Sequence, residues 1–217
     1  MHLSLTNLGF YLVIGGLIIL ILSLVPTNYN KLVSNNWSIA QESLYVTIHN
    51  IVTNQINARH GQIYFPFIYT LFVFILINNL IGMVPYSFAS TGHFALTFAL
   101  SFTIVLGATI LGFQKHGLKF FSLLVPAGCP LGLLPLLVTI EFISYLARCV
   151  SLALRLGANI VAGHMLLSIL SGFVYNIMVL VIPLIAFSGL EMMIALIQAQ
   201  VFVVLTSSYI KDGLDLH

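Results

Sequence analysis

One apolar stretch of the sequence holds the side chains best suited to moving protons. "SLALRLGANIVAGH", from Ser151 to His164, places Arg155, Asn159 and His164 among residues that fit the interior of a bilayer. An ionisable group at membrane depth costs a few kcal/mol or more, so each such residue is a functional hypothesis first. Imidazoles can carry protons because their pKa values lie near ambient pH, whereas arginine, with a pKa above about 12, stays charged. The stretch therefore contains one candidate proton carrier and one fixed cation.

Helical spacing divides the polar residues of this region between two faces. Positions seven apart share a face of a helix, which groups Glu141, Arg148 and Arg155 on one stripe. Asn159, four residues past Arg155, extends that stripe. His164 is nine residues from Arg155, so it falls on nearly the opposite face and about 13 Å further along the axis. A fixed cation between two polar clefts would block direct proton passage, and it could help a passing carboxylate to release its proton.

The last apolar segment predicts a second polar face. Glu191 and Gln198 are again seven apart and share one side of a helix. If that side faces the first helix, His164 and Glu191 form a relay, whereas His164 alone would be an ordinary buried histidine. Asn159 and Gln198 could be ordinary interhelical hydrogen-bond partners, although we favour a water-lined or arginine-positioning role for both.

The charged residues also have structural interpretations. Arg155 could pair a carboxylate of its own chain, but Glu141 lies about 21 Å away along the helix and only Glu191 could come from the facing segment. We therefore favour a functional role for Arg155. Arg148 fits a second pathway position or a structural ion pair equally well. Glu141 could be a carboxylate near a helix start, although we favour a proton-exit role. The histidines in or near loops need no special role: His2, His49, His60, His93, His116 and His217.

Composition indicates the class of protein. The 217 residues are 60% hydrophobic and only 6% charged, whereas a soluble domain has roughly 25% charged residues. So few charges could not cover a soluble fold, and the sequence predicts an integral membrane protein. The net charge of +2 is too small to indicate nucleic acid as a partner. Cys129 and Cys149 match no metal spacing, and we expect buried free thiols. There is no glycine-rich phosphate loop, and we expect neither a cofactor nor a metal.

Apolar runs predict an all-α fold with a single membrane domain over residues 1–217. Residues 8–25 form an uncharged run that exceeds a signal-peptide core and follows no Lys or Arg, so we expect a retained transmembrane helix. Residues 63–84 and 94–113 predict a transmembrane hairpin. Residues 37–57 place apolar side chains at helical spacing opposite polar ones. That pattern fits an amphipathic helix on the membrane surface or a helix packed on neighbouring protein.

The C-terminal part predicts a long, steeply tilted two-helix hairpin. Residues 120–172 begin with Pro126, Pro130 and Pro135, and an arginine-containing helix of about 35 residues could then run for about 50 Å. Residues 177–212 can form a final helix of similar length. Since a perpendicular span needs only about 20 residues, both helices must tilt or lie partly along the membrane plane.

Charge placement predicts the orientation. If the N-terminus lies outside, the cations of the loops and the C-terminal tail all fall on the inner side, as the positive-inside rule requires. The loops at residues 85–93 and 171–176 would lie outside, and they contain no charged residue. The cations on the inner side are Lys31, Arg59, Lys115, Lys119 and Lys211.

At these residues the chain resembles subunit a of the F-type ATP synthase. "SLALRLGANIVAGH" is similar to the family's arginine helix, with Leu-Arg-Leu, an Asn four residues past the Arg, and then Ala-Gly. "LEMMIALIQAQVFVVLTSSYIKD", at 190–212, resembles the family's final helix, and "NNLIGMVPYSFA", at 78–89, resembles the end of its second helix. The resemblance implies a proton-channel (stator) subunit of a rotary ATP synthase, without catalytic residues of its own.

The resemblance also implies residue roles. Arg155 would be the family's essential arginine, facing the ring of c subunits, with Asn159 on the same face and Gln198 opposite. His164 and Glu191 would occupy the paired sites of the half-channel through which protons enter, in the arrangement of mitochondrial members.

Glu141 would lie in the second half-channel, which leads to the matrix. Two offset half-channels would then pass protons to and from the c-ring carboxylates, and the resulting rotation would drive ATP synthesis. The implied partners are the c-ring, other membrane-sector and peripheral-stalk subunits, protons and the lipid bilayer. The implied location is the mitochondrial inner membrane, multi-pass, with the N-terminus in the intermembrane space and the C-terminus in the matrix.

Two other functions fit a chain of this composition. A secondary transporter would couple a small solute to protons, but it predicts internal inverted repeats and broken helices, and neither is visible in the sequence. A structural subunit of a respiratory complex would use its buried charges for assembly only. Proton conductance without another substrate would distinguish a channel subunit from the transporter. Copurification with a ring of small helical hairpins would distinguish it from the structural subunit.

Overall fold

A computed structural model gives the arrangement of the chain over residues 6–24, 36–56, 58–84, 87–117, 134–174 and 178–214. The regular elements in these ranges are all helical. They are α1 (Asn7–Leu24), α2 (Asn36–Gln55), α3 (Ala58–Gly82), the 3-10 helix η1 (Ser90–Gly92), α4 (Phe94–His116), α5 (Leu134–Val174), the 3-10 helix η4 (Met178–Leu180) and α6 (Val181–Leu214).

The helices confirm the predicted all-α membrane class. α1, α3, α4, α5, and α6 together with η4, are each long and apolar enough to cross a membrane. The chain is therefore a multi-pass membrane protein. α3 begins at Ala58 rather than at residue 63, because its first turn is polar and gives no apolar signal. Most of the expected proline-broken segment, residues 120–133, lies outside the described residues.

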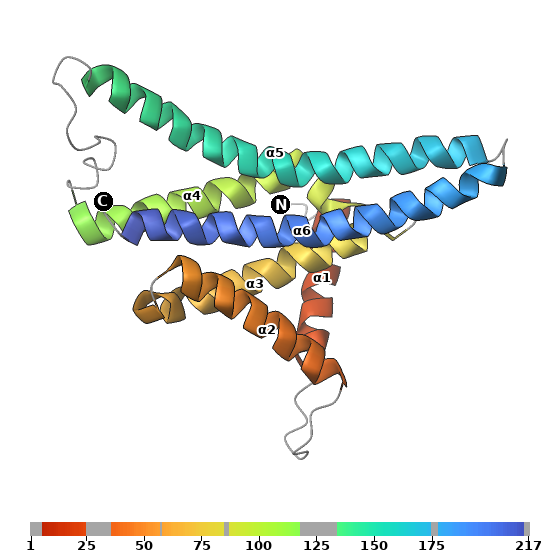
Figure 1. The fold of residues 1–217 in the computed structure, drawn as a ribbon, viewed down its shortest axis with the longest axis horizontal. Coiled ribbons are helices and arrows are strands. Elements are labelled where there is room, and N and C mark those ends of the chain that lie inside the picture. Colours follow the sequence, from red (N-terminus) through yellow and green to blue (C-terminus); the bar gives the residue numbers. More distant parts are fainter. Residues whose placement is uncertain are drawn as a thin grey trace.

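The long hairpin of α5 and α6 runs across the whole molecule (Figure 1). The two helices are antiparallel and in contact, and α4 packs against both. α3 contacts α6, α2 contacts α3 and α6, and α1 contacts α3 and η1. One side of α5 thus faces α4, η1 and α6, while its other side has no neighbouring element within the described ranges.

α5 and α6 are both longer than a perpendicular membrane span requires. α5 has 41 residues and α6 has 34. At 1.5 Å per residue α5 measures about 60 Å, which is about twice the thickness of the hydrocarbon core. A helix of that length must tilt steeply or run partly along the membrane plane. The length of α5 therefore fits the steeply tilted hairpin that the sequence predicts.

Apolar side chains of α2, α3, α4, α5 and α6 form one buried core. On α5, Leu152, Ala153 and Leu156 are buried, whereas Leu154 and Arg155 are exposed. The arginine therefore lies on the side of α5 that the bundle does not cover. Representative core residues from the other helices are Ile48, Val52, Ile68, Ile75, Val105, Phe202 and Val203.

Two hydrogen bonds fix how α5 is rotated about its axis. The Ser101 hydroxyl of α4 donates to the backbone carbonyl of Cys149 over 2.6 Å, and the Tyr145 hydroxyl donates to the carbonyl of Val105 over 3.3 Å. Because both bonds hold α5 against α4, they also determine where Arg155 points. Cys149 is a buried free thiol, as predicted. Cys129 lies outside the described residues.

The last turns of α4 and α6 are held together closely. Lys115 Nζ donates to the carbonyl of Leu214 over 2.9 Å, and His116 Nε2 lies 3.0 Å from the same oxygen. Cationic donors near a helix C-terminus are favourable because the final carbonyls carry partial negative charge. Gly213 permits the approach: a Cβ added there would lie 2.9 Å from the backbone oxygen of Ala108.

We expect Gly213→Ala to destabilise the protein, because the new methyl group must displace the backbone of α4. Overpacking of this kind costs about 1–3 kcal/mol. Gly107→Ala is the matched control, since a Cβ at Gly107 meets nothing within 4 Å. The midpoint of thermal unfolding in detergent should fall for Gly213→Ala only. Equal midpoints for the two variants would contradict the close α4–α6 contact.

Candidate functional site

Arg155 lies on the uncovered side of α5. Its side chain is exposed and lines a shallow apolar groove on this side, together with Leu154 and Ala158. The ion pairs within the described ranges involve a different arginine, so Arg155 has no carboxylate partner there. A permanent cation on an apolar, open face is available to a carboxylate of another chain.

Asn159 and Gln198 join α5 to α6 one turn beyond the arginine. Asn159 Nδ2 donates to Gln198 Oε1 over 3.1 Å. Gln198 is buried, and its Nε2 has no hydrogen-bond partner among the described residues. The pair therefore makes the interhelical bond that the sequence suggested as one alternative. The donor of this pair that has no partner among the described residues is the buried Nε2 amide of Gln198 on α6.

Glu191 is a buried carboxylate without a partner. Its side chain is only 8% exposed, and neither carboxylate oxygen has a hydrogen-bond partner among the described residues. It packs against Gly163 of α5, where an added Cβ would collide with Oε1. It lines a cavity of about 200 Å³ between α5 and α6, together with Asn159. Because burying an unpaired polar group is costly, Glu191 is a functional candidate and not an ordinary packing residue.

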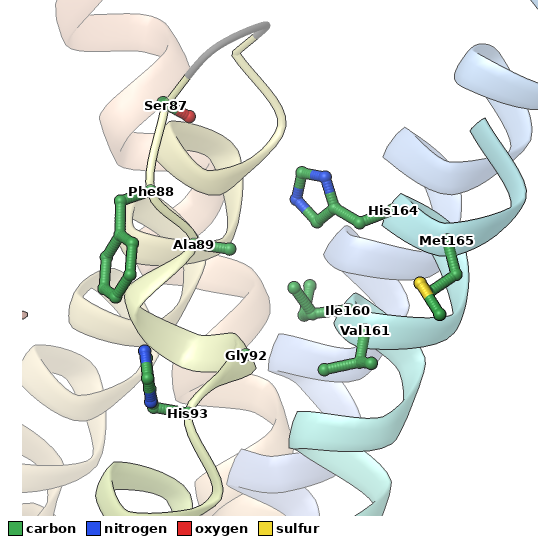
Figure 2. Close-up of a pocket in the computed structure, with 9 residues that line it drawn as sticks. All are labelled: Ser87, Phe88, Ala89, Gly92, His93, Ile160, Val161, His164 and Met165. Atoms are coloured by element: carbon green, nitrogen blue, oxygen red, sulfur yellow. The ribbon is translucent and has the colours of Figure 1, made fainter. Parts of the chain in front are cut away.

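His164 lines a different cavity. This space, of about 370 Å³, lies between α5 and the loop around η1 (Figure 2). The ring of His164 points from α5 towards that loop, and its Nε2 is buried without a hydrogen-bond partner in the described ranges. The ring is near enough to interact electrostatically with Glu191. The two side chains thus lie on either side of the α5 backbone and line separate cavities, so they do not share one open cleft.

Arg148 sits at the other end of the hairpin in an ion-pair cluster. Its guanidinium lies 3.7 Å from Glu141 and 3.5 Å from Asp212 of α6. All three side chains are partly exposed, so each pair contributes about 0–1 kcal/mol. Arg148 therefore makes the contacts expected of a structural ion pair, which is one of its two interpretations. The seven-residue spacing placed Glu141 and Arg148 on one face of α5 without predicting their contact, and no spacing rule connects Asp212 with a residue of another helix.

Two buried polar residues, Asn79 and Thr91, were not predicted as site residues from the sequence. Asn79 of α3 donates through Nδ2 to the carbonyl of Ala195 over 3.5 Å, which places it between Glu191 and Gln198 along α6. Its Oδ1, like the hydroxyl of Thr91 in η1, is buried and unpartnered within the described chain. The adjacent asparagines at 78 and 79 in an apolar run were the available signal.

The arrangement separates two polar regions along one helix. Glu141 and His164 are 23 positions apart on α5, a distance of about 35 Å. Arg155 and the Asn159–Gln198 bond lie between them. Chemically, each region can accept and release protons, while the guanidinium between them cannot.

Comparison with known proteins identifies the family. A family model described as ATP synthase A chain matches residues 9–211. Proteins named ATP synthase subunit a are similar over the full chain: one from Podospora anserina is 74% identical and one from Neurospora crassa 75%, with 86% and 87% of their lengths covered. One from Eremothecium gossypii is 49% identical over 99% of this chain and 86% of its own length. The resemblance drawn from the arginine and final helices is thereby confirmed, and the chain belongs to the ATP synthase A chain family.

Proposed function

We propose that the chain is the proton-channel subunit of the membrane sector of a rotary ATP synthase. The observation that carries the proposal is Arg155, a cation with no partner within the described chain, which lies on the open face of α5 between two polar regions. A cation there requires an anionic partner from outside, and a carboxylate that moves past it supplies one.

Protons enter through the region around His164 and Glu191. An unpaired buried carboxylate accepts a proton readily, because the neutral form removes the cost of burying the charge. Glu191 then passes the proton to a carboxylate on a ring of c subunits. Once protonated, that carboxylate is neutral and can face lipid as the ring turns.

Protons leave through the region around Glu141. After nearly a full turn the ring carboxylate meets this second region and releases its proton towards Glu141, with Arg148 and Asp212 nearby. Arg155 holds the deprotonated carboxylate briefly and separates the two regions electrically. Each proton that crosses 100 mV supplies about 2.3 kcal/mol, and the sum over several protons turns the ring and drives ATP synthesis in the soluble head.

The uncovered face of α5 supports a helical ring as the partner. Large apolar side chains surround Arg155 there, among them Leu146, Val150 and Leu154. Such a face is suited to packing against lipid-like helices that slide past it. The same proposal places the chain in the mitochondrial inner membrane with its N-terminus in the intermembrane space, alongside other membrane-sector and peripheral-stalk subunits.

We expect Arg155→Ala to abolish proton-driven ATP synthesis in membrane vesicles that contain the assembled complex. Arg155→Lys should fail as well, because a desolvated lysine can lose its proton and lacks the planar fork of arginine. Leu154→Ala, at the neighbouring exposed position, should retain most of the rate. Normal synthesis by Arg155→Ala in complexes that contain the ring would overturn the proposal.

Exchanging the two entry residues should be better tolerated than losing either. We expect the double variant His164→Glu with Glu191→His to conduct more protons than His164→Ala or Glu191→Ala alone, since it keeps one imidazole and one carboxylate at the site. Proton flux into reconstituted vesicles measures the difference. If the double variant is no better than the single ones, the two residues do not act as a pair.

Gly163→Ala should impair proton transport by displacing Glu191, whose carboxylate occupies the space of the added methyl group. A displacement of about 1 Å can cost up to about 100-fold in a reaction that depends on alignment. Gly172→Ala is the control on the same helix, because a Cβ there meets nothing within 4 Å. Similar proton flux in both variants, at equal amounts of assembled complex, would show that the position of Glu191 is not limiting.

A further inference from the structure

A short loop forms one wall of the cavity beside His164. Residues 87–92, which we call the entry loop, connect α3 with α4 and include the 3-10 helix η1. Ala89 and Gly92 of this loop line the cavity together with His164. Figure 2 shows Ala89 on the side of the loop that faces His164, and the ring of Phe88 on the other side. The position of the entry loop therefore sets the width of this cavity.

Asn78 of α3 holds the entry loop through Ser90. The Ser90 hydroxyl donates to Asn78 Oδ1 over 3.3 Å, and Asn78 Nδ2 donates to the backbone carbonyl of Phe74 over 2.9 Å. Asn78 and Ser90 are both buried. A distance of 3.3 Å is already long for a hydroxyl donor, so a small further displacement of the Asn78 amide would break its bond to the loop.

α1 packs against the same amide. Gly15 of α1 is buried, and a Cβ added there would lie 2.8 Å from Asn78 Oδ1, the oxygen that accepts the Ser90 hydroxyl. One turn earlier on α1, the ring centroid of Tyr11 lies 5.8 Å from that of Phe88 in the entry loop. Because residues four apart share a face of a helix, one face of α1 contacts both the loop and the side chain that holds it.

The entry loop connects α1 mechanically with the cavity. Its η1 turn contacts both α1 and α5. The Phe88 side of the loop meets α1, whereas the Ala89 side faces the cavity and His164 of α5. A change at the α1 contact must therefore be taken up by the loop that forms the cavity wall.

We propose that α1 positions the entry loop, and that Gly15 and Asn78 are positioning residues for proton entry. Gly15 lets α1 approach Asn78, the Asn78 amide holds Ser90, and Ser90 fixes the loop at the cavity. Nε2 of His164 is buried and has no hydrogen-bond partner among the described residues, so water in the cavity must deliver its protons. The width of the cavity then controls that delivery. The inference rests on the proposed function.

The test compares Gly15→Ala with Gly16→Ala, because a Cβ at Gly16 meets nothing within 4 Å. Proton flux is measured in vesicles that contain equal amounts of assembled complex. Gly15→Ala should lower the flux by about tenfold at an outer pH of about 8 and by about twofold or less at a pH of about 6, because a displaced wall slows delivery most when protons are scarce. Gly16→Ala should keep the parent flux at both pH values.

Ser90→Ala tests the connection between α1 and the entry loop. It removes the hydroxyl that bonds to Asn78, so it should give the same pH-dependent loss. If Gly15→Ala acts through this bond, the double variant should lose no more flux than either single variant, since the effects of coupled residues are not additive. Ser43→Ala, whose exposed hydroxyl bonds within α2, is the control and should keep the parent flux.

Three results would overturn the role of α1 and, if Arg155→Ala remains inactive, leave the proposed function intact. They are equal flux in Gly15→Ala and Gly16→Ala, a loss that is the same at both pH values, and a double variant whose loss is the product of the single losses. Normal transport by Arg155→Ala would instead remove the proposed function. If Gly15→Ala does not assemble, Ser90→Ala is judged against Ser43→Ala by the same pH criterion.

Discussion

A guanidinium that cannot lose its proton is the constraint on which the rest of this structure depends. Arg155 stands on an apolar face of α5 without a carboxylate partner in the described chain, and burial of such a cation in hydrocarbon is expensive. No carboxylate of the described chain offsets that cost, which is why we propose an anionic partner from another subunit. A fold that exposes an unpaired cation on an apolar face is suited to the transient anionic partner that we propose.

In the proposed mechanism, the long hairpin of α5 and α6 accommodates the fixed charge of Arg155. Two proton regions on either side of a fixed charge must be offset, because a straight passage would bypass the cation. In the proposed mechanism, α5, with 41 residues, carries both regions on one continuous helix, about 35 Å apart. The hydrogen bonds of α4 to α5 and of Asn159 to Gln198 then fix the rotation and spacing of the hairpin.

The helices and the order of polar residues along α5 were predictable, because apolar runs and seven-residue spacing are local properties of the sequence. Apart from the Asn159–Gln198 bond, which the sequence suggested as one alternative, contacts across helices were not predictable. The pairing of Arg148 with Asp212, and the separation of His164 and Glu191 into two cavities, depend on how α5 is rotated against α4 and α6. The close fit of Gly163 against Glu191 likewise depends on the distance between two helices. No periodicity encodes that rotation or that distance.

Most of the buried polar atoms that lack a partner in the described chain lie near the proposed entry region. Native proteins leave few buried polar groups unpaired. Among the described residues such atoms occur on His49 of α2 and, around the junction of α3, η1, α5 and α6, on Asn79, Thr91, His164, Glu191 and Gln198. The apolar core along the rest of the bundle must offset that cost. Because natural proteins break local rules mainly at functional sites, the grouping of most of these atoms at one junction supports the proposed proton entry there.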